Sequence, residues 1–374
     1  MKDFLARYLV PGLVIQAVMV GGGYSTGREL VEFFLAAGPA TGLLGMALTA
    51  ALFSAGAMIS FELARAYGAF DYRAFTRVLL GRFWVLYELG YLTGLALVIS
   101  VVSSAAAELL AQRLGLPPMA SSIAFMAVIG GLVFFGNTIL ERIISAWSVV
   151  FYLAYGTLFV LVALRFGPGL RHAVAATPAN FAAAALGGLT YTGYNISILP
   201  ALIFVARRPR TRREALCAGA LAGPLILAPG VALLLTLSAF YPAIAQAPLP
   251  ISLVLDRLAA PWLELVISAV ILGALIKTGA GLLHGFNERL AGVAEERGML
   301  MPRVARSAVA IVVMAVSIYL AAAVGLVRLI AYGYRYSGYY FLLVFVLPLL
   351  TRGLYLVVRR GRLDALAAPA VETA

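Results

Sequence analysis

The sequence predicts an all-α integral membrane protein with ten transmembrane helices, arranged as two five-helix repeats of opposite orientation. Three observations predict this fold class. The chain of 374 residues is 63% hydrophobic and 12% charged, whereas a soluble domain carries about 25% charged residues. Long apolar runs follow one another with only short polar connections. Two of these runs, five places apart in the order, are interrupted in the middle by glycine and polar residues.

Ten apolar runs are long enough to cross a bilayer, for which a helix needs roughly 20 residues. Because a backbone in lipid must satisfy its own hydrogen bonds, we expect each run to be helical. The runs cover residues 4–36, 39–64, 83–112, 118–136, 143–164, 179–206, 214–240, 261–287, 304–323 and 326–350. Prolines such as Pro117 and Pro302 mark the connections, because proline cannot continue a helix.

The distribution of positive charge predicts the orientation, because cytoplasmic loops carry an excess of Lys and Arg. With the N-terminus inside, 20 of the 28 basic residues fall on the cytoplasmic side, 5 fall outside and 3 lie within the runs. We therefore expect both termini to lie in the cytoplasm and the protein to cross a bacterial-type inner (plasma) membrane several times. The net charge of +12 then faces the anionic inner leaflet and does not indicate nucleic-acid binding. The basic stretch from Arg207 to Arg213 is interpreted as a loop anchor.

Two of the runs are interrupted, the first at Gly21-Gly22-Gly23 and the sixth around residues 191–197. Five helices separate them, and because five is odd the second copy runs through the membrane upside down. We expect residues 1–170 to form the first repeat, 171–352 the inverted second repeat, and 353–374 a cytoplasmic C-terminal tail. Interrupted helices at matching positions of two halves point to the central binding site of a transporter.

The interruptions are expected to form a substrate site, because unwound backbone exposes polar groups that lipid cannot satisfy and a polar ligand can. The N-terminal ends of half-helices favour a carboxylate, and the C-terminal ends favour a cation. The alternative is that the glycines only permit tight helix packing. The residues expected at the substrate are Gly21, Gly22, Gly23, Tyr24, Ser25, Thr26, Tyr191, Thr192, Gly193, Tyr194 and Asn195, with Tyr91 on the third run as a weaker candidate.

Two stretches resemble a known family. The sequence VGGGYSTGRELVEFF (20–34) is similar to the first-helix signature of the YkvI-like membrane proteins, and TGAGLLHGFNERL (278–290) resembles the end of their eighth helix. That group belongs with the amino acid–polyamine–organocation (APC) superfamily and the LeuT fold. The resemblance implies an inverted five-plus-five bundle and secondary transport of amino-acid-like solutes.

Lys277 lies midway along the eighth run, where a charge costs at least about 2.5–3.5 kcal/mol. The resemblance implies that this helix and the first break supply oxygens to sodium in sodium-coupled members of the fold. Thr278 and first-helix carbonyls offer such oxygens here, but an ammonium lies beside them. We expect Lys277 to replace sodium, either as a fixed cation or as a group that exchanges protons during transport. The alternative is a static pair with a carboxylate or with carbonyls.

Further charges follow the first interruption and mark candidate gating residues: Arg28, Glu29, Glu32 and Arg335. Arg28 and Glu32 are four residues apart and can pair on one helix face. Three roles remain open for Arg28 and Glu29: gating of the outer side, contact with the substrate, or a structural ion pair. Arg335 lies among five tyrosines in YGYRYSGYY, so a tyrosine-lined packing seam is the alternative to an outer gate.

These features predict a secondary active transporter, a symporter, for an amino acid or a related amine or zwitterion. We expect it to be independent of sodium and coupled to protons through Lys277, with the solute, the bilayer and protons as its partners. The alternative is a ligand-sensing membrane receptor on the same fold. The sequence contains neither HExxH nor a GxxxxGK[ST] phosphate loop, so we expect no enzyme, no ATP-driven pump, no cofactor and no metal site.

Overall fold

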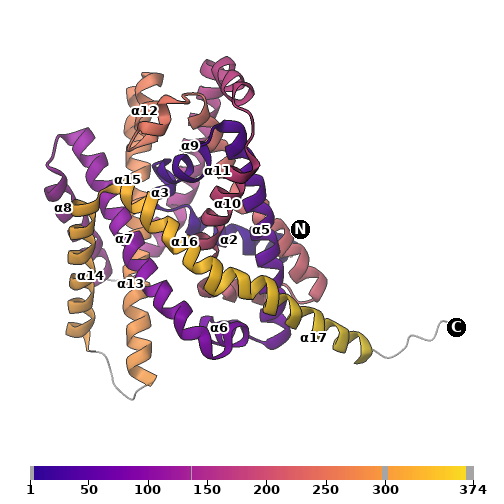
Figure 1. Cartoon of the computed structure of the whole chain (residues 1–374). Coiled ribbons are helices and arrows are strands. Elements are labelled where there is room, and N and C mark those ends of the chain that lie inside the picture. Colours follow the sequence, from indigo (N-terminus) through magenta and orange to yellow (C-terminus); the bar gives the residue numbers. More distant parts are fainter. Residues whose placement is uncertain (1–3, 136, 297–301, 368–374) are drawn as a thin grey trace.

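The computed structural model describes residues 4–135, 137–296 and 302–367 and is helical throughout, with no strand in these residues (Figure 1). The prediction of an all-helical membrane protein is therefore confirmed for the described part. Lys2 and Arg297, which contributed to the charge count, and the last residues of the predicted tail, 368–374, lie outside it.

The first half contains the interrupted run and four long or apolar helices, joined by short segments of 3-10 or π geometry that carry the label η. Its elements are η1 (Leu5–Leu9), α2 (Val10–Met19), α3 (Gly22–Ser25), α4 (Arg28–Leu30), η2 (Val31–Leu35), α5 (Pro39–Tyr67), α6 (Tyr72–Leu80), η3 (Gly81–Phe83), α7 (Trp84–Leu114), α8 (Pro118–Phe135) and α9 (Asn137–Ala176).

The second half begins with a bent helix pair. Its elements are α10 (Phe181–Ile196), η4 (Leu199–Arg207), α11 (Arg212–Ser238), η5 (Ala243–Gln246), α12 (Pro250–Leu258), α13 (Pro261–Glu296), α14 (Arg303–Val324), α15 (Leu326–Arg328), η6 (Leu329–Tyr334), α16 (Arg335–Phe341), η7 (Leu342–Val346), η8 (Leu349–Gly353) and α17 (Leu354–Ala367). The predicted tail thus begins as the helix α17.

By length and composition, seven helices in the described residues can cross a membrane, or eight if the bent pair α10 and η4 is one span. Two shorter apolar helices, Leu5–Met19 and Pro118–Val133, fall below this length. The first run does not qualify because its helix stops at Met19. The described part is therefore a multi-pass membrane protein.

Polar side chains fix where several helices begin. Asp71 accepts a hydrogen bond from the amide of Ala74 at 2.8 Å and so starts α6. Asn180 caps α10 in the same way, through the amide of Ala183 at 3.0 Å. Thr211 and Glu214 form a reciprocal capping box at the start of α11. Each cap satisfies amide groups that have no partner within the helix.

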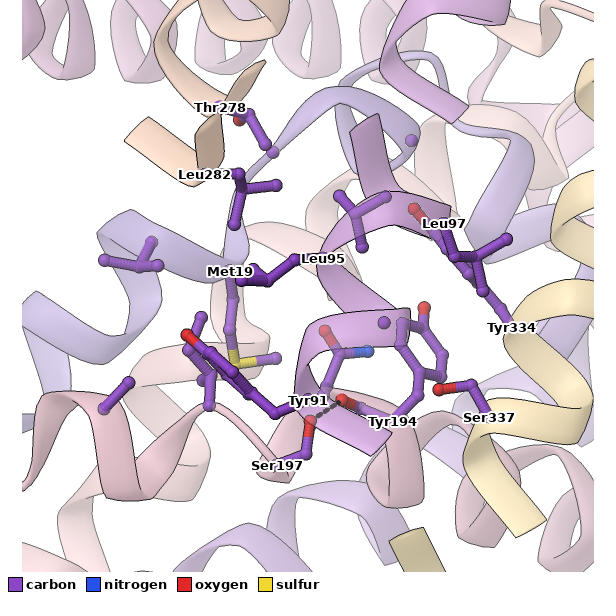
Figure 2. A pocket seen from close by; sticks show the side chains of 18 of the residues that line it. Met19, Tyr91, Leu95, Leu97, Tyr194, Ser197, Thr278, Leu282, Tyr334 and Ser337 are labelled. Carbon is purple, nitrogen blue, oxygen red and sulfur yellow. Dashed lines mark hydrogen bonds between the residues drawn. The ribbon is translucent and has the colours of Figure 1, made fainter. Parts of the chain in front are cut away.

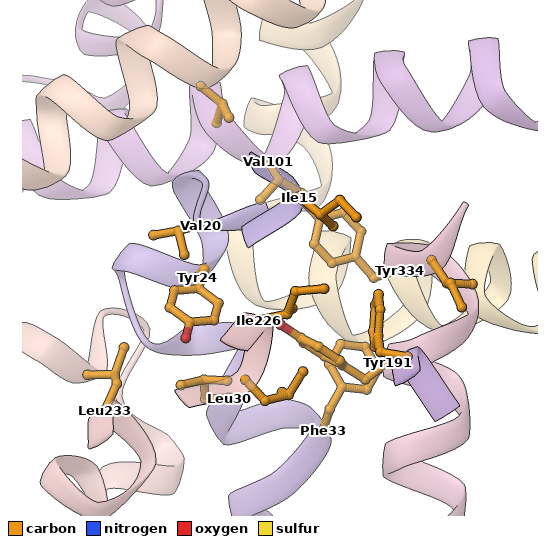
Figure 3. Packing of buried hydrophobic residues seen from close by; sticks show 14 of the residues in the cluster. Ile15, Val20, Tyr24, Leu30, Phe33, Val101, Tyr191, Ile226, Leu233 and Tyr334 are labelled. Atoms are coloured by element: carbon orange, nitrogen blue, oxygen red, sulfur yellow. The ribbon is translucent and has the colours of Figure 1, made fainter. Parts of the chain in front are cut away.

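The long helices pack against partners five places away in the predicted order: α5 against α11, α7 against α13, and α8 against α14. The last two pairs form one side of the bundle (Figure 1). Small residues allow the closest approach, since a Cβ on Gly223 of α11 would lie 2.0 Å from the carbonyl oxygen of Ala50 on α5. Around the first interruption, the buried side chains of Tyr24, Phe33 and Tyr191 belong to one continuous apolar cluster (Figure 3).

Candidate functional site

The first interruption lies between α2 and α3. Helix α2 ends at Met19, and Val20 leaves helical geometry with φ −72° and ψ 77°. The amide of Gly21 turns back to the carbonyl of Met19 at 2.8 Å. The next helix, α3, has only four residues, and Gly27, with φ +79°, then redirects the chain into α4. The carbonyls at the end of α2 therefore lack the partners that a continuing helix would provide.

The second interruption lies between α10 and η4, whose axes are bent by 68°. The hydroxyl of Ser197 donates to the carbonyl of Tyr194 at 2.6 Å, drawn as a dashed line in Figure 2. The hydroxyl of Tyr87 on α7 donates to the carbonyl of Ser197. Side chains therefore satisfy backbone groups that the bend takes out of the helical ladder.

A cavity of about 410 Å³ is lined by residues of both interruptions, together with α7, α13, η6 and α16 (Figure 2). This volume lies in the range of small-molecule sites, which is roughly 300–1,000 Å³. Among the residues singled out from the sequence, those that line it are Gly21, Gly23, Glu29, Tyr91, Tyr194, Asn195, Lys277 and Thr278. Lining residues that sequence reasoning missed include Met19, Ser197, Tyr334, Ser337 and Phe341.

Six expected substrate residues do not line this cavity: Tyr24, Ser25, Thr26, Tyr191, Thr192 and Gly193. They face the protein interior instead. Tyr191 packs against Phe34 with ring centroids 4.9 Å apart. A Cβ on Gly193 would lie 2.3 Å from the carbonyl oxygen of Gly338, so this glycine serves the contact of α10 with α16. Gly22 begins α3, and its surroundings lie outside what the structure describes.

Lys277 reaches the end of α2. Its ammonium donates to the carbonyl of Ala17, in the last turn of that helix, at 2.8 Å. No carboxylate among the described residues forms an ion pair with it. Thr278 adjoins the interruption, since a Cβ on Gly21 would lie 3.1 Å from its hydroxyl oxygen. The sequence left open a static pair of Lys277 with a carboxylate or with carbonyls, and the structure shows the contact with a carbonyl, that of Ala17.

Glu29 lies at the cavity and is 6% exposed. Its Oε2 accepts a hydrogen bond from the hydroxyl of Tyr194 at 2.7 Å. Its Oε1 would lie 2.1 Å from a Cβ on Gly23. Only glycine therefore leaves room for this carboxylate at the interrupted backbone. Glu29 therefore lines the cavity, whereas Arg28, Glu32 and Arg335, the other three residues expected to gate the site, do not.

Those other three charges form one cluster. Glu32 accepts hydrogen bonds from Arg28 and from Arg335, each at 2.9 Å. Arg28 also donates to the carbonyls of Ala245 and Ala247, at 3.0 and 3.1 Å. The cluster joins the first run, the last run and the connection after α11. None of its three charged side chains lines the cavity.

A second cluster lies at the opposite end of the cavity's helices, around Arg289 of α13. The guanidinium lies 3.4 Å from the ring centroid of Tyr72 on α6 and 4.5 Å from that of Tyr91 on α7. Its Nε donates to Glu88 at 2.6 Å. Neither Arg289 nor Glu88 was among the candidate site residues predicted from the sequence. Since Tyr91 also lines the cavity, this cation–π and ion-pair contact adjoins the site.

Comparison with known proteins shows the fold. No protein-family model and no curated protein matches the chain. MhsT in complex with L-phenylalanine matches with a TM-score of 0.60 and 14% identity, over 96% of this chain and 97% of that one. The manganese transporter of Eremococcus coleocola matches with a TM-score of 0.58 and 15% identity, over 92% and 78%. A Na⁺-coupled sialic acid symporter in a substrate-bound outward-open state matches with a TM-score of 0.50 and 11% identity, over 86% of this chain and 80% of that one.

The chain has the LeuT fold. The matching proteins are named for three different solutes, an amino acid, a metal ion and a sugar acid. A shared fold does not determine which solute a member carries. Any ligand of this LeuT-fold protein must therefore be inferred from the side chains of its own cavity.

The contact of Glu29 with Gly23 predicts a coupling between these positions. Gly23→Ala is expected to lower stability by about 1–3 kcal/mol, the usual cost of overpacking. In a Glu29→Ala background the same change is expected to cost much less, because the clashing carboxylate is gone. Thermal unfolding of wild type, both single variants and the double variant measures this coupling. Equal costs of Gly23→Ala in both backgrounds would contradict the geometry.

Proposed function

We propose that the chain is a secondary active transporter for a small polar solute, an amino acid or a related amine or zwitterion. The observation that carries this proposal is the cavity between two interrupted helices, with Lys277 at the end of one of them. Non-helical backbone at membrane depth is tolerated only where it is buried in protein or lines a water-filled cavity, and here it lines a cavity. The transporters that share the fold support the same function.

We propose that ten spans cross the membrane, with the helices holding Gly21–Gly23 and Tyr191–Ser197 unwound near its middle. The seven long helices, the bent pair and the two shorter apolar helices together supply ten crossings. The packing of α5, α7 and α8 against α11, α13 and α14 supports inverted repeats over 1–170 and 171–352. The motifs at 20–34 and 278–290 both border the cavity, which supports a relationship to YkvI-like proteins of the APC superfamily.

The ion pairs support the orientation expected from the positive charges. Arg7 with Glu214 and Arg289 with Glu88 join residues that the charge count assigns to the cytoplasm. Arg113, which the count assigns to the outside, pairs with Glu264 near the predicted outer start of the eighth run. Each pair thus connects residues of one predicted side. In this orientation both termini lie in the cytoplasm of a bacterial-type inner membrane.

We propose that Lys277 supplies the positive charge that a sodium ion would otherwise bring. The ammonium lies at the C-terminal end of α2, where the helix dipole and free carbonyls favour a cation. Half-buried in the bundle, it exchanges its proton during the transport cycle and so couples solute movement to protons. Transport is then independent of sodium.

Transport requires a barrier on each side of the cavity. We propose that Arg28, Glu32 and Arg335 form the outer barrier, since their ion pairs link the first and last runs. The contact of Arg289 with Tyr91 and Glu88 then forms the inner barrier. Opening each in turn exposes the same cavity to opposite sides.

A receptor on the same fold is the second candidate function, because a receptor also needs a ligand cavity and both barriers can serve a signalling change. Purified protein in proteoliposomes separates the two, with a panel of radiolabelled amino acids and amines. Accumulation of a solute driven by a proton gradient supports transport. Saturable binding without flux supports the receptor.

Lys277→Met keeps an unbranched side chain, shorter by one atom, and removes its charge. For a solute that wild type accumulates, we expect this variant to lose uptake driven by a proton gradient, while exchange of internal for external solute is retained more fully. The measurement compares both modes in proteoliposomes with and without sodium. Proton-driven, sodium-independent uptake at the wild-type rate in Lys277→Met would rule out the coupling role.

The two barriers can be opened separately. Ser337→Cys in a Cys217→Ser background places the only thiol in the cavity. Glu32→Gln is expected to speed its labelling by an impermeant maleimide from outside by about tenfold, which corresponds to ~1.4 kcal/mol lost from the closed state. Glu88→Gln is expected to speed labelling from the cytoplasmic side instead, and each variant serves as the control for the other. Acceleration from both sides by both variants would contradict separate barriers.

A further inference from the structure

Among the described residues that line the cavity, Glu29 alone has a carboxyl group and Lys277 alone has an amino group. The ammonium of Lys277 already donates to the carbonyl of Ala17. Glu29, by contrast, forms no ion pair with any described residue. The neighbouring Arg28 is engaged elsewhere by Glu32. Neither group is therefore paired with an opposite charge among the described residues, but Lys277 is held by the carbonyl at the end of a helix, whereas Glu29 has only the hydroxyl of Tyr194.

A buried carboxylate without a counter-ion is costly, because water and cations no longer stabilise its charge. One neutral donor, the hydroxyl of Tyr194, binds Oε2 at 2.7 Å. A carboxylate can accept up to about four hydrogen bonds. Glu29 thus has the capacity and the electrostatic need for a cationic donor, and the cavity is where such a donor can enter.

The position of this carboxylate excludes an acidic ligand group beside it. Oε1 lies over Gly23, at the interrupted backbone where amide groups would otherwise attract an anion. Two carboxylates placed together in a site of low dielectric repel one another. The protein's own carboxylate therefore occupies this end of the cavity, and a positively charged donor is the ligand group that compensates its charge most fully.

Aromatic rings surround the same end. Tyr194 stacks on Tyr334, with centroids 4.7 Å apart and planes at 28°. Both rings line the cavity, and Tyr194, Tyr334 and Ser337 lie close together in Figure 2. The faces of such rings attract ammonium groups. Leucines at positions 95, 97, 202 and 282 line the remainder of the cavity and suit a hydrocarbon side chain.

We propose that Glu29 binds the ammonium group of the solute and thereby selects compounds that carry a cationic nitrogen on an apolar body. The inference rests on the proposed function for its role in transport, because the solute bound at Glu29 is the one carried. The ammonium donates to Oε1 of Glu29 and contacts the rings of Tyr194 and Tyr334. The apolar body of the solute lies against the leucines.

Six probes isolate the group that is recognised. Phenethylamine and isoamylamine carry only an ammonium, L-phenylalanine and L-leucine carry both charges, and hydrocinnamate and isocaproate carry only a carboxylate. A ligand that binds the folded protein raises its melting temperature. We expect at least one ammonium-bearing probe to stabilise wild type and neither carboxylate-only probe to do so. Stabilisation by a carboxylate-only probe, or by none of the four ammonium compounds, would overturn the proposal.

Three variants test the residue itself. Glu29→Gln is expected to weaken the stabilising probe by about 10- to 100-fold in Kd, the range for loss of a charge-assisted hydrogen bond. Glu29→Asp keeps the charge and is expected to recover part of the affinity. The matched control is Glu264→Gln, on α13, whose carboxylate pairs with Arg113 and does not line the cavity. Wild-type affinity in Glu29→Gln, or an equal loss in Glu264→Gln, would contradict the assignment.

Uptake of the same probe separates this proposal from the function on which it rests. Binding that depends on Glu29 without uptake in proteoliposomes would refute transport and leave the ammonium site standing. Uptake by Glu29→Gln with the wild-type KM would refute the ammonium site and leave transport standing.

Discussion

The hydrogen bond from Lys277 to the carbonyl of Ala17 is the interaction on which the rest of the site depends. Helix α2 stops at Met19, and its last carbonyls carry the negative end of the helix dipole into the interior of a membrane protein. Such an end needs a positive partner. In this chain the described partner is the ammonium of Lys277 on α13, which we propose takes the place of a mobile ion.

Lys277 holds the end of α2, so Glu29 is the group of the cavity whose partner can change. Gly27 redirects the chain after α3, and Glu29 then returns over Gly23 to meet Tyr194 of α10. This contact joins the two interrupted runs through one carboxylate. A solute that neutralises the carboxylate would also change what holds these runs together. In the proposed transporter, binding of the solute at Glu29 would therefore alter the contact between the first and sixth runs.

Tyr91 links the cavity to the inner barrier in a comparable way, because its ring contacts both the cavity and the guanidinium of Arg289. The outer barrier has a different link, since Glu32 lies one turn after Glu29 on the first run. Occupation of the cavity can therefore influence both barriers through side chains that are direct neighbours. Long-range pathways are not needed to connect binding with opening.

Features that depend on neighbouring residues in the sequence could be predicted. The apolar runs predicted the helices, and the glycine and polar stretches predicted where α2 and α10 end. The four-residue spacing of Arg28 and Glu32 predicted their pairing. Other features depend on contacts between distant segments. The left-handed Gly27 breaks the helical phase, so no helical wheel could show that Glu29 turns to the cavity.

The same limit applies to the sixth run and to the inner barrier. Tyr194 and Asn195, in the last turn of α10 before its 68° bend, line the cavity, whereas Tyr191, one turn earlier, packs against Phe34. The partners of Arg289 come from α6 and α7, about two hundred residues earlier in the chain. Neither arrangement leaves a local pattern, because each is set by how whole helices pack.

The most direct test of the central claim is the sodium dependence of thermal stability in purified wild-type protein. Melting temperatures are compared in sodium chloride and choline chloride at equal ionic strength, because a cation that binds the folded state raises its melting temperature. Since the ammonium of Lys277 holds the cation position, the melting temperature is expected to be the same in both salts. A saturable rise with sodium and not with choline would contradict the claim.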